Sequence, residues 1–336
     1  MTADTLSDVL RLVRLRGALF FYVTGSNQWV AEAPPARDIA SAVMPGSEHV
    51  MEYHVVVAGD CWAGLVGEPP VRLSAGDVLV FPHGDGHVMS SAPGLRANPQ
   101  VSWYHEMMVD ALPLRVAYDG TSPPSLEPPR GEPATTLVCG FLGCDVRPFN
   151  PLVATLPRML LVRGSDGGEW ISQLMRHAVS ESAARRPGAD AMLSRMSEMM
   201  FVEAVRRHVD SLPEESTGWL AGLRDRHVGR ALTLLHARPA DPWTVDALGS
   251  QVGLSRSALH ERFVRFVGQA PMQYLANWRM QLASGLLRNT SSTVAAIAQE
   301  VGYESEAAFA RAFKRSVGSP PAAWRRGMRD GLPLPR

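Results

Sequence analysis

The C-terminal third of the chain contains an internal repeat, which limits the possible folds more than any other feature of the sequence. Residues 252–255 (VGLS) recur as residues 301–304 (VGYE), at an offset of 49. Further positions recur at an offset of 50, where Phe263, Gly268, Pro271 and Tyr274 correspond to Phe313, Gly318, Pro321 and Trp324. A pattern that occurs twice at nearly constant spacing indicates two copies of one supersecondary unit.

Each copy has the sequence pattern of a helix-turn-helix. A short helix is expected over Val245–Val252 in the first copy and over Val294–Val301 in the second, and each ends at a glycine that can adopt a left-handed conformation. A second helix follows a tight turn, with Ser255 as its N-cap in the first copy and Ser305 near its start in the second. In such motifs the second helix enters the DNA major groove. The alternative is a pair of helical hairpins without a role in DNA binding.

The repeat lies in the basic part of the chain. The 336 residues include 33 Lys and Arg and 33 Asp and Glu, so the formal net charge is zero. Residues 222–336 hold 16 of the basic and 8 of the acidic residues, a local charge of +8, and residues 1–221 therefore carry −8. This asymmetry indicates a polyanionic partner for the C-terminal part only, and with the helix-turn-helix pattern the expected partner is double-stranded DNA.

The run from Trp243 to Trp324 resembles the AraC-type (AraC/XylS) family of bacterial transcription regulators. The resemblance is carried by the stretches TVDALGSQVGLSRSALHERF, YLANWRMQLASGLLRNT and VAAIAQEVGYESEAAFARAFKRSVGSPPAAW. It implies two helix-turn-helix units joined by a long helix at about Pro271–Leu287, which read two adjacent major-groove segments on one face of the DNA. RNA polymerase and a second copy of the chain, in a homodimer, are further expected partners.

Helical geometry divides each recognition helix into a buried side and a DNA-facing side. Leu259 and Phe263 are spaced i, i+4 and are expected to be buried, as are Phe309 and Phe313. The remaining positions are the candidate DNA-contacting residues: Arg256, Ser257, His260, Glu261, Arg262 and Arg265 in the first helix, and Ser305, Glu306, Ala307, Ala310, Arg311, Lys314 and Arg315 in the second.

These candidates divide into base-reading and phosphate-binding residues. Arg311 is the best candidate for a bidentate contact to guanine, and Glu306 is suited to accept a hydrogen bond from cytosine. The expected phosphate-binding residues, which give affinity without sequence information, are Arg265, Arg279, Lys314 and Arg315. The alternative for each arginine is a solvated surface charge.

The N-terminal part has a β-rich pattern, with short apolar runs separated by Gly, Pro and Asp. The expected strands are Leu19–Thr24, Tyr53–Val57, Val71–Leu73, Val78–Pro82, Val101–Val109 and Thr135–Phe141. Beyond Pro157 the pattern becomes helical.

Residues 76–87 resemble the second cupin motif, G-x5-P-x-G-x2-H, which ends at His87. Glu52, followed seven positions later by Gly59, resembles the end of the first cupin motif. The His-x-His pair that precedes this glutamate in cupins is absent, and Ser91 stands where the second motif usually ends in asparagine. The N-terminal part is therefore more similar to the cupin-like sensor domains of AraC-type regulators than to cupin enzymes.

The predicted fold is α+β with several domains. A cupin-like β-barrel sensor domain is expected over residues 1–157 and a helical connector over residues 158–218. The connector either forms a dimer, docks the two domains or packs on the barrel. An all-α double helix-turn-helix domain is expected over residues 222–330.

A metal site can be assembled from other residues of the cupin-like domain. His54 shares a strand face with Glu52, because side chains alternate along a strand. His54, His87 and Cys139, with His83 or Cys144, would form a tetrahedral site for a zinc-type divalent metal. The alternative is structural: Cys139 as a small core residue and His87 hydrogen-bonded to the backbone.

Two other kinds of effector site are compatible with the sequence. Gly140 and Gly143 would allow the chain to fold back and bring Cys139 and Cys144 within disulfide distance, as in a redox sensor. A small organic effector would need an apolar pocket, for which the candidate lining residues are Trp62, Trp103, Tyr104, Met107 and Met108.

The sequence therefore predicts a transcription regulator, without enzyme activity, whose cupin-like domain senses a small molecule, a metal or an oxidant. The first alternative is a metal-dependent cupin enzyme fused to a DNA-binding domain, against which the missing His-x-His pair argues. The second is an architectural DNA-binding protein, which leaves the acidic residues 1–221 unexplained. The acidic start, the three cysteines and the absence of an apolar run of about 20 residues predict a cytoplasmic protein that does not enter the membrane.

Overall fold

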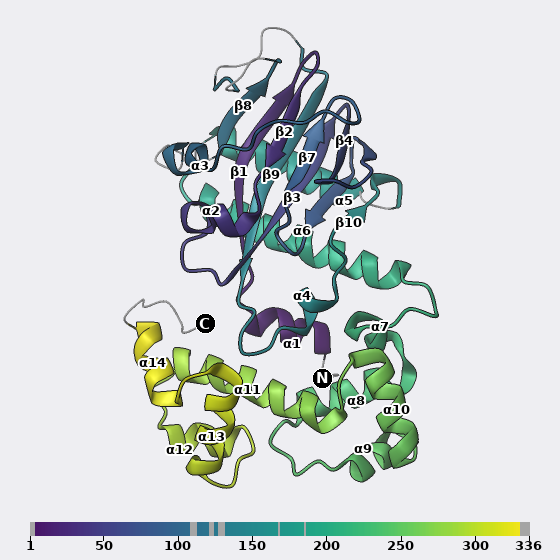
Figure 1. The fold of residues 1–336 in the computed structure, drawn as a ribbon, viewed down its shortest axis with the longest axis vertical. Helices are drawn as coiled ribbons and strands as arrows, with labels where there is room; N and C mark the ends of the chain where they lie inside the picture. Colours follow the sequence, from purple (N-terminus) through teal and green to yellow (C-terminus); the bar gives the residue numbers. More distant parts are fainter. Residues whose placement is uncertain are drawn as a thin grey trace. The chain divides into compact units, whose positions relative to one another are not determined.

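The structure is a computed structural model that describes residues 4–107, 113–120, 124–126, 132–166, 169–184 and 186–329. The chain forms two compact units, and each unit combines segments that are distant in sequence (Figure 1). The helical unit comprises Met1–Arg14, Asp145–Thr155 and Leu212–Arg336, and the strand unit comprises Leu15–Cys144 and Leu156–Ser211. Among the described residues, every helix is too short or too polar to cross a membrane.

The strand unit contains two β-sheets. The first has six strands in the order β10 (Leu160–Val162), β6 (Val78–Phe81), β3 (His49–Ala58), β9 (Thr135–Cys144), β1 (Arg16–Gly25) and β8 (Leu114–Tyr118). The second has four strands in the order β2 (Val30–Ala33), β7 (His87–Ser90), β4 (Asp60–Leu65) and β5 (Val71–Ser74). Adjacent strands are antiparallel except for the pair β1 and β8. The cupin-like fold is confirmed, although the described strands form two sheets and not one closed barrel.

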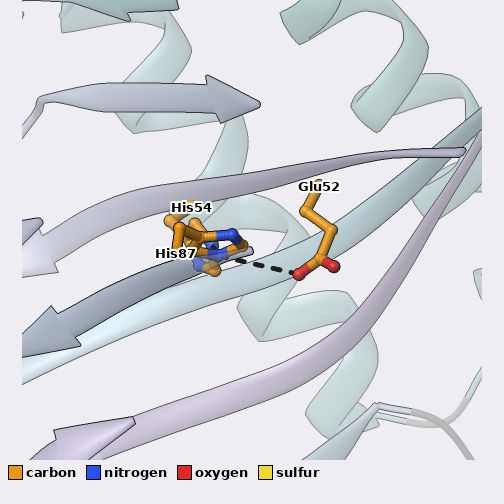
Figure 2. Close-up of side chains that lie close together, drawn as sticks. All are labelled: Glu52, His54 and His87. Carbon is orange, nitrogen blue, oxygen red and sulfur yellow. Dashed lines mark hydrogen bonds and ion pairs between the residues drawn. The ribbon is translucent and has the colours of Figure 1, made fainter. Parts of the chain in front are cut away.

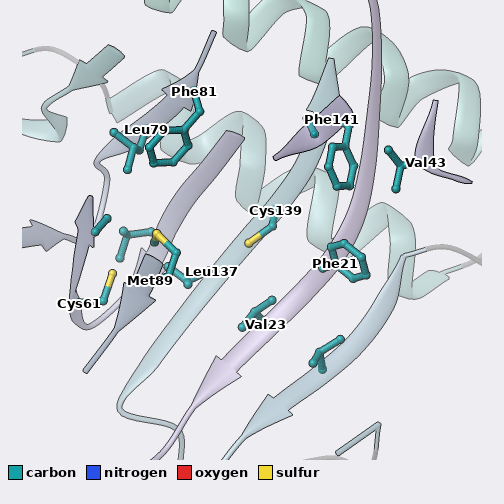
Figure 3. Close-up of a cluster of buried hydrophobic side chains, with 14 of the residues drawn as sticks. Phe21, Val23, Val43, Cys61, Leu79, Phe81, Met89, Leu137, Cys139 and Phe141 are labelled. Carbon is teal, nitrogen blue, oxygen red and sulfur yellow. The ribbon is translucent and has the colours of Figure 1, made fainter. Parts of the chain in front are cut away.

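The core of the strand unit lies between the two sheets (Figure 3). Phe21 and Cys139 on the six-stranded sheet, and Cys61 and Met89 on the four-stranded sheet, belong to one buried apolar cluster. All ten residues of β9 are buried, so this strand lacks the alternation of a half-exposed strand. Both faces of the six-stranded sheet are therefore covered at this central strand.

Two long helices, α5 (Glu169–Ala184) and α6 (Ala189–Ser211), pack on the six-stranded sheet. The Ser197 hydroxyl oxygen lies 2.7 Å from the Tyr53 hydroxyl oxygen. A Cβ atom at Gly17 would lie 2.6 Å from the Ser197 Cβ, so glycine is needed where β1 approaches α6. Most of the region predicted as a connector thus packs on the sheet, whereas the Met199 side chain, in the same helix, is 52% exposed.

One predicted strand is wrong. Residues 101–109 were expected to be extended, but Val101–Met107 form helix α3, and residues 108 and 109 lie outside the described residues. In this helix Trp103 and Tyr104 both pack against Phe21, with ring centroids 5.5 Å and 6.1 Å away. Aromatic and β-branched composition favoured a strand, but tertiary contacts determine the local structure here. The other short elements of the two units are α2 (Ala36–Val43), α4 (Pro151–Thr155) and a 3-10 turn at Gly164–Asp166.

The helical unit contains the repeated motif. Its helices are α1 (Thr5–Leu12), α4, α7 (Trp219–Arg224), α8 (Arg226–Ala237), α9 (Val245–Val252), α10 (Arg256–Val267), α11 (Pro271–Asn289), α12 (Val294–Glu300), α13 (Glu306–Val317) and α14 (Pro321–Arg329). The first helix-turn-helix is α9–α10 and the second is α12–α13, and α11 joins them. Two predicted helix-turn-helix units and the long connecting helix are therefore confirmed.

The predicted capping residues determine where these helices begin and end. Gly253 has a φ of 76° and ends α9, as the left-handed cap requires. The Ser255 hydroxyl accepts a hydrogen bond from the Ala258 N–H at the start of α10, and Ser305 accepts one from Ala308 at the start of α13. The predicted core residues of both recognition helices are fully buried: Leu259, Phe263, Phe309 and Phe313.

Candidate DNA-reading face and candidate metal centre

The two recognition helices, α10 and α13, present the candidate DNA-contacting residues on their outer sides. Twelve of the thirteen candidates are exposed: Arg256, Ser257, His260, Glu261, Arg262, Arg265, Ser305, Glu306, Ala307, Arg311, Lys314 and Arg315. Ala310 is half-buried. The i, i+4 spacing therefore correctly predicts which side of each recognition helix is buried and which is exposed. The buried phenylalanines determine the side that faces the core.

Several of these polar side chains already have partners inside the helical unit. Arg262 forms a bidentate ion pair with Asp225, with a shortest N–O distance of 2.6 Å, and Asp225 also caps the N-terminus of α8. Arg256 lies 3.2 Å from a carboxylate oxygen of Asp246. The Arg279 guanidinium, an expected phosphate ligand, donates to the carbonyl oxygens of Pro239 and Asp241. The functional groups of Arg262 and Arg279 are therefore used for folding.

Helix α13 differs from α10, because two of its cationic side chains have no partner among the described residues. Within the described residues, no hydrogen bond or ion pair involves the side chains of Arg311 and Lys314, and both side chains are exposed. Glu306 begins the helix, where its charge is favourable to the positive end of the helix dipole. The second recognition helix therefore has guanidinium and ammonium groups that are available to a polyanion.

A cluster of polar side chains is buried in the strand unit (Figure 2). Glu52 and His54 lie on β3, His87 begins β7, and their nearest ligand atoms all lie within 4.8 Å of one another. The His54 Nε2 and His87 Nε2 atoms are 2.7 Å apart, and the His87 Nε2 lies 3.7 Å from a Glu52 oxygen. Cys139 is paired with His54 across β3 and β9, and its Sγ lies 3.0 Å from the His54 Nδ1.

The structure thus brings together three of the four predicted metal ligands, His54, His87 and Cys139. His83 is not among them, because its Nε2 lies 2.9 Å from the carbonyl oxygen of Leu156. Glu52 belongs to the cluster but was absent from the predicted ligand set. Glu52 lies two residues before His54 on the same strand face, and this spacing could have identified it as a candidate ligand.

Burial controls the protonation of this cluster. It raises the pKa of the Glu52 carboxyl to about 8 and lowers the pKa of His87 to about 4. Burial, and then the neighbouring His87, also lower the pKa of His54, and burial raises the pKa of the Cys139 thiol. Each group therefore favours its uncharged form in a protein without a bound cation.

The donor set fits a divalent metal. The Glu52 Oε1 atom is buried and has no hydrogen-bond partner among the described residues. Buried polar atoms in folded proteins usually have one. One carboxylate and two imidazoles are ligands that zinc and related divalent ions prefer, and the Cys139 sulfur lies beside them. A cation here would offset the cost of burying the Glu52 charge.

The cluster adjoins a small apolar cavity of about 60 Å³, whose lining includes Phe21, Trp103, Tyr104 and Tyr118. A second, more polar cavity of about 430 Å³ shares Trp103, Tyr104 and Tyr118 with it. Trp103 and Tyr104 thus line the cavities as expected, and Trp62 does not. Of the two methionines predicted to line a pocket, Met108 and the Met107 side chain lie outside the described structure.

The predicted approach of Cys139 and Cys144 is wrong. Both lie on β9, which stays extended through Gly140 and Gly143. Five residue steps along a strand separate the Cα atoms by about 16 Å, far more than a disulfide can span. Both side chains are buried, and among the described residues neither forms a disulfide.

Comparisons with known proteins give a cupin domain followed by a helix-turn-helix domain. A family described as Cupin matches residues 4–210, and a family described as Helix-turn-helix domain matches residues 248–327. A protein of Streptomyces lividans named as an AraC-like transcription regulator is 31% identical over 325 residues, which cover 96% of this chain and 98% of that protein. The transcriptional regulator AlkR of Acinetobacter baylyi is 26% identical over 326 residues, covering 96% of this chain and 99% of AlkR. Among solved structures, the DNA-binding domain of AdpA in complex with a target DNA is 28% identical and matches with a TM-score of 0.31, covering 32% of this chain and 96% of that domain.

Proposed function

This chain belongs to the AraC-type family of DNA-binding transcription regulators with an N-terminal cupin domain, and from this premise we propose that it controls transcription in response to a ligand bound in the strand unit. The observation that carries the proposal is the buried cluster of Glu52, His54 and His87, whose donor atoms lie within 4.8 Å of one another beside an apolar cavity. A carboxyl and two imidazoles buried together, with pKa values shifted by burial, are typical of a functional site in a cleft.

The ligand that we propose is a zinc-type divalent metal held by Glu52, His54 and His87, with Cys139 beside His54. Such a metal supplies a positive charge and an open coordination position. The adjoining cavities offer aromatic side chains to a small organic effector, which the open position would orient. An effector that binds one conformation of the strand unit more tightly would shift the population of the DNA-competent state.

The first prediction concerns metal content. Purified full-length protein supplied with zinc should retain about one equivalent per chain by elemental analysis and native mass spectrometry, and zinc at about 100 times its dissociation constant should stabilise the fold by about 2.7 kcal/mol. The His87→Asn variant should lose this zinc, because it removes a central ligand. The His83→Asn variant is the matched control and should retain it, because His83 binds a backbone carbonyl. Retention of zinc by His87→Asn, or its loss by His83→Asn, would contradict the ligand assignment.

We further propose that the cupin domain binds its ligand without converting it, since the relatives compared above are named as regulators. The AraC-type domain supports double-stranded DNA as the partner. A homodimer, contact with RNA polymerase and a cytoplasmic location are proposals that rest on the requirements of bacterial transcription control. A metal-dependent cupin enzyme remains the alternative, and turnover of a small molecule by the zinc-loaded protein would favour it.

A second prediction separates base reading from phosphate binding on α13. Arg311→Ala should cost about 1–3 kcal/mol on the preferred DNA site and relax the preference at one or two base pairs. Lys314→Ala should weaken binding to all sequences about equally, because a phosphate contact carries no base information. Selection on a randomised DNA library measures both profiles. Identical profiles for the two variants would contradict this division of roles.

A further inference from the structure

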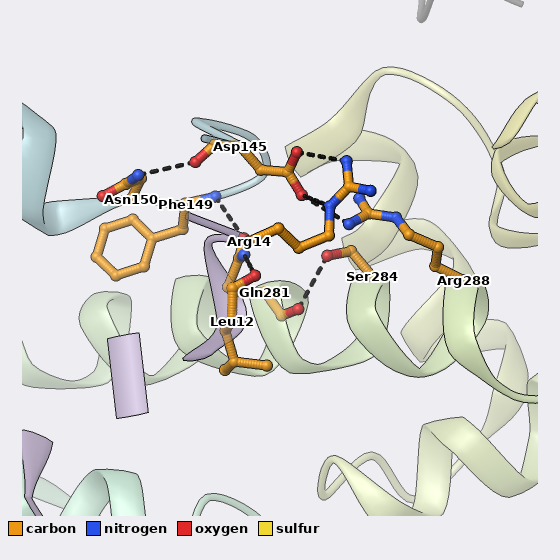
Figure 4. Close-up of polar contacts among 8 residues, drawn as sticks. All are labelled: Leu12, Arg14, Asp145, Phe149, Asn150, Gln281, Ser284 and Arg288. Carbon is orange, nitrogen blue, oxygen red and sulfur yellow. Dashed lines mark hydrogen bonds and ion pairs between the residues drawn. The ribbon is translucent and has the colours of Figure 1, made fainter. Parts of the chain in front are cut away.

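Within the helical unit, two chain segments from outside the C-terminal third lie on the connecting helix α11 (Figure 4). We refer to Asp4–Arg14 and Asp145–Asn150 as the bridging segments. The Asp145 carboxylate accepts hydrogen bonds from the Arg14 Nε and Nη2, both at 2.7 Å, and from the Arg288 Nη1 of α11 at 2.6 Å. The Asp145 side chain is 3% exposed, the Arg288 side chain 13% and the Arg14 side chain 31%, so the carboxylate at the centre of this ion triad is shielded from water.

A second contact ties both bridging segments to the middle of α11. The Gln281 Oε1 accepts a hydrogen bond from the Phe149 N–H at 3.1 Å, and its Nε2 donates to the Leu12 carbonyl oxygen at 3.3 Å. Gln281 is 2% exposed, so both groups of its amide are used inside the protein. One turn further along α11, Leu12 is the nearest neighbour that a side chain at Gly285 would meet. Glycine is a weak helix former, so the bridging segments cover a part of α11 where the helix is intrinsically less stable.

The bridging segments also contact helix α8, which packs against α9 and α10 of the first helix-turn-helix. The Thr5 hydroxyl oxygen lies 3.5 Å from the Thr233 hydroxyl oxygen on α8, and an Asp8 oxygen lies 3.8 Å from the buried His236 Nδ1. His236 in turn stacks on Trp278 of α11 at a centroid distance of 3.8 Å. Contacts of the bridging segments therefore extend from α8 to Arg288, near the end of α11.

The two halves of α11 belong to different helix-turn-helix cores. Tyr274 packs against Phe263 of α10, with ring centroids 5.8 Å apart. Met280, Ala283 and Leu287 instead belong to the core that contains Phe309 and Phe313. Any bend or twist of α11 between these halves would change the separation and relative rotation of the two recognition helices.

We propose that the bridging segments fix the geometry of the two recognition helices relative to each other, and that Asp145 is the positioning residue on which this depends. Two helices that read adjacent major-groove segments must match the rise and rotation of the DNA, about 34–36 Å per turn. A single base pair inserted between the two half-sites rotates one of them by about 35° relative to the other. A stiff α11 makes this mismatch costly, and a loosened α11 tolerates it.

The test uses the full-length protein and a DNA site selected from a randomised library, with one base pair inserted or deleted between the two half-sites. For the unaltered protein, we expect each change of spacing to weaken binding by about tenfold or more, because the DNA must be deformed to restore the match. For Arg14→Gln, which leaves Asp145 and Arg288 as a balanced pair, the loss should fall to about threefold. Asp145→Asn should reduce it at least as much. Arg11→Gln is the matched control, because Arg11 is exposed on α1 and pairs only with Asp8 among the contacts described, and it should keep the full spacing penalty.

Base preferences within each half-site provide the readout that separates positioning from a general structural role. They should stay unchanged in Arg14→Gln, because neither recognition helix is altered. The proposal is overturned if folded Arg14→Gln and Asp145→Asn proteins keep the full spacing penalty. It is also overturned if they lose affinity equally at every spacing. Neither result would bear on zinc binding by His87, so the proposed function of the strand unit is tested separately.

Discussion

Replacing Asp145 with asparagine should lower the free energy of unfolding of the helical unit by about 3–5 kcal/mol, the cost of breaking a buried ion pair by removing one partner. The Asp145 carboxylate accepts hydrogen bonds from two guanidinium groups and is 3% exposed. Asparagine leaves two positive charges close together with no carboxylate between them. Arg288 has no other acceptor close by to replace the lost carboxylate, because its Nε is already buried without a hydrogen-bond partner among the described residues.

Urea unfolding of the full-length protein measures this effect. If the two units unfold at different urea concentrations, each is analysed as its own transition. Asp241→Asn is a suitable control, because Asp241 pairs with Arg238 across 3.5 Å at an exposed position and should change stability by less than about 1 kcal/mol. The double variant Asp145→Asn with Arg14→Gln should recover part of the loss, since it removes one of the two uncompensated cations. Equal effects of Asp145→Asn and Asp241→Asn would show that solvent screens the triad.

Binding to DNA should weaken by about 40-fold when the salt concentration rises from 50 to 200 mM. This value assumes that the three remaining phosphate-binding candidates, Arg265, Lys314 and Arg315, each displace counterions, which gives a slope of about −2.7 in a plot of log affinity against log salt. Two expected cations are left out of this set, because Arg262 pairs with Asp225 and Arg279 donates to backbone carbonyl oxygens.

Single substitutions test which cations contact the DNA. Lys314→Gln should reduce the steepness of the slope by about 0.9, because one phosphate contact is lost. Arg262→Gln should leave the slope unchanged, although it removes the ion pair to Asp225. Titrations at four or more salt concentrations resolve this difference. A reduced slope for Arg262→Gln would mean that this arginine leaves Asp225 and binds DNA.

The sequence predicted the helical motifs well because their determinants are local. Gly253 and Ser255 act within one turn of the helix ends that they cap, and the buried phenylalanines follow helical periodicity. The wrong strand at residues 101–109 has the opposite cause, since Trp103 and Tyr104 are placed by contacts to Phe21, about 80 positions earlier in the chain. Composition alone does not contain such contacts.

The candidate metal centre was predictable only in part. The cupin motif pointed to His87, and strand alternation linked Glu52 to His54. The register that sets Cys139 opposite His54 was not visible in the sequence, because it depends on which strands are neighbours. No sequence pattern predicted the Asp145 triad, because its three residues are separated by 131 and 143 positions and no motif connects them.

The discontinuity of the helical unit affects how the protein is made on the ribosome. Thr5 and its contact residue Thr233 are 228 positions apart, so at about 5–20 residues per second the chain grows for about 10–45 s before this pair can form. An isolated helix as short as α1, with eight residues, is unstable in water, so its segment stays unfolded during this time. During synthesis the segment that forms α1 therefore has no folded partner in the helical unit until the residues of α8 have been translated.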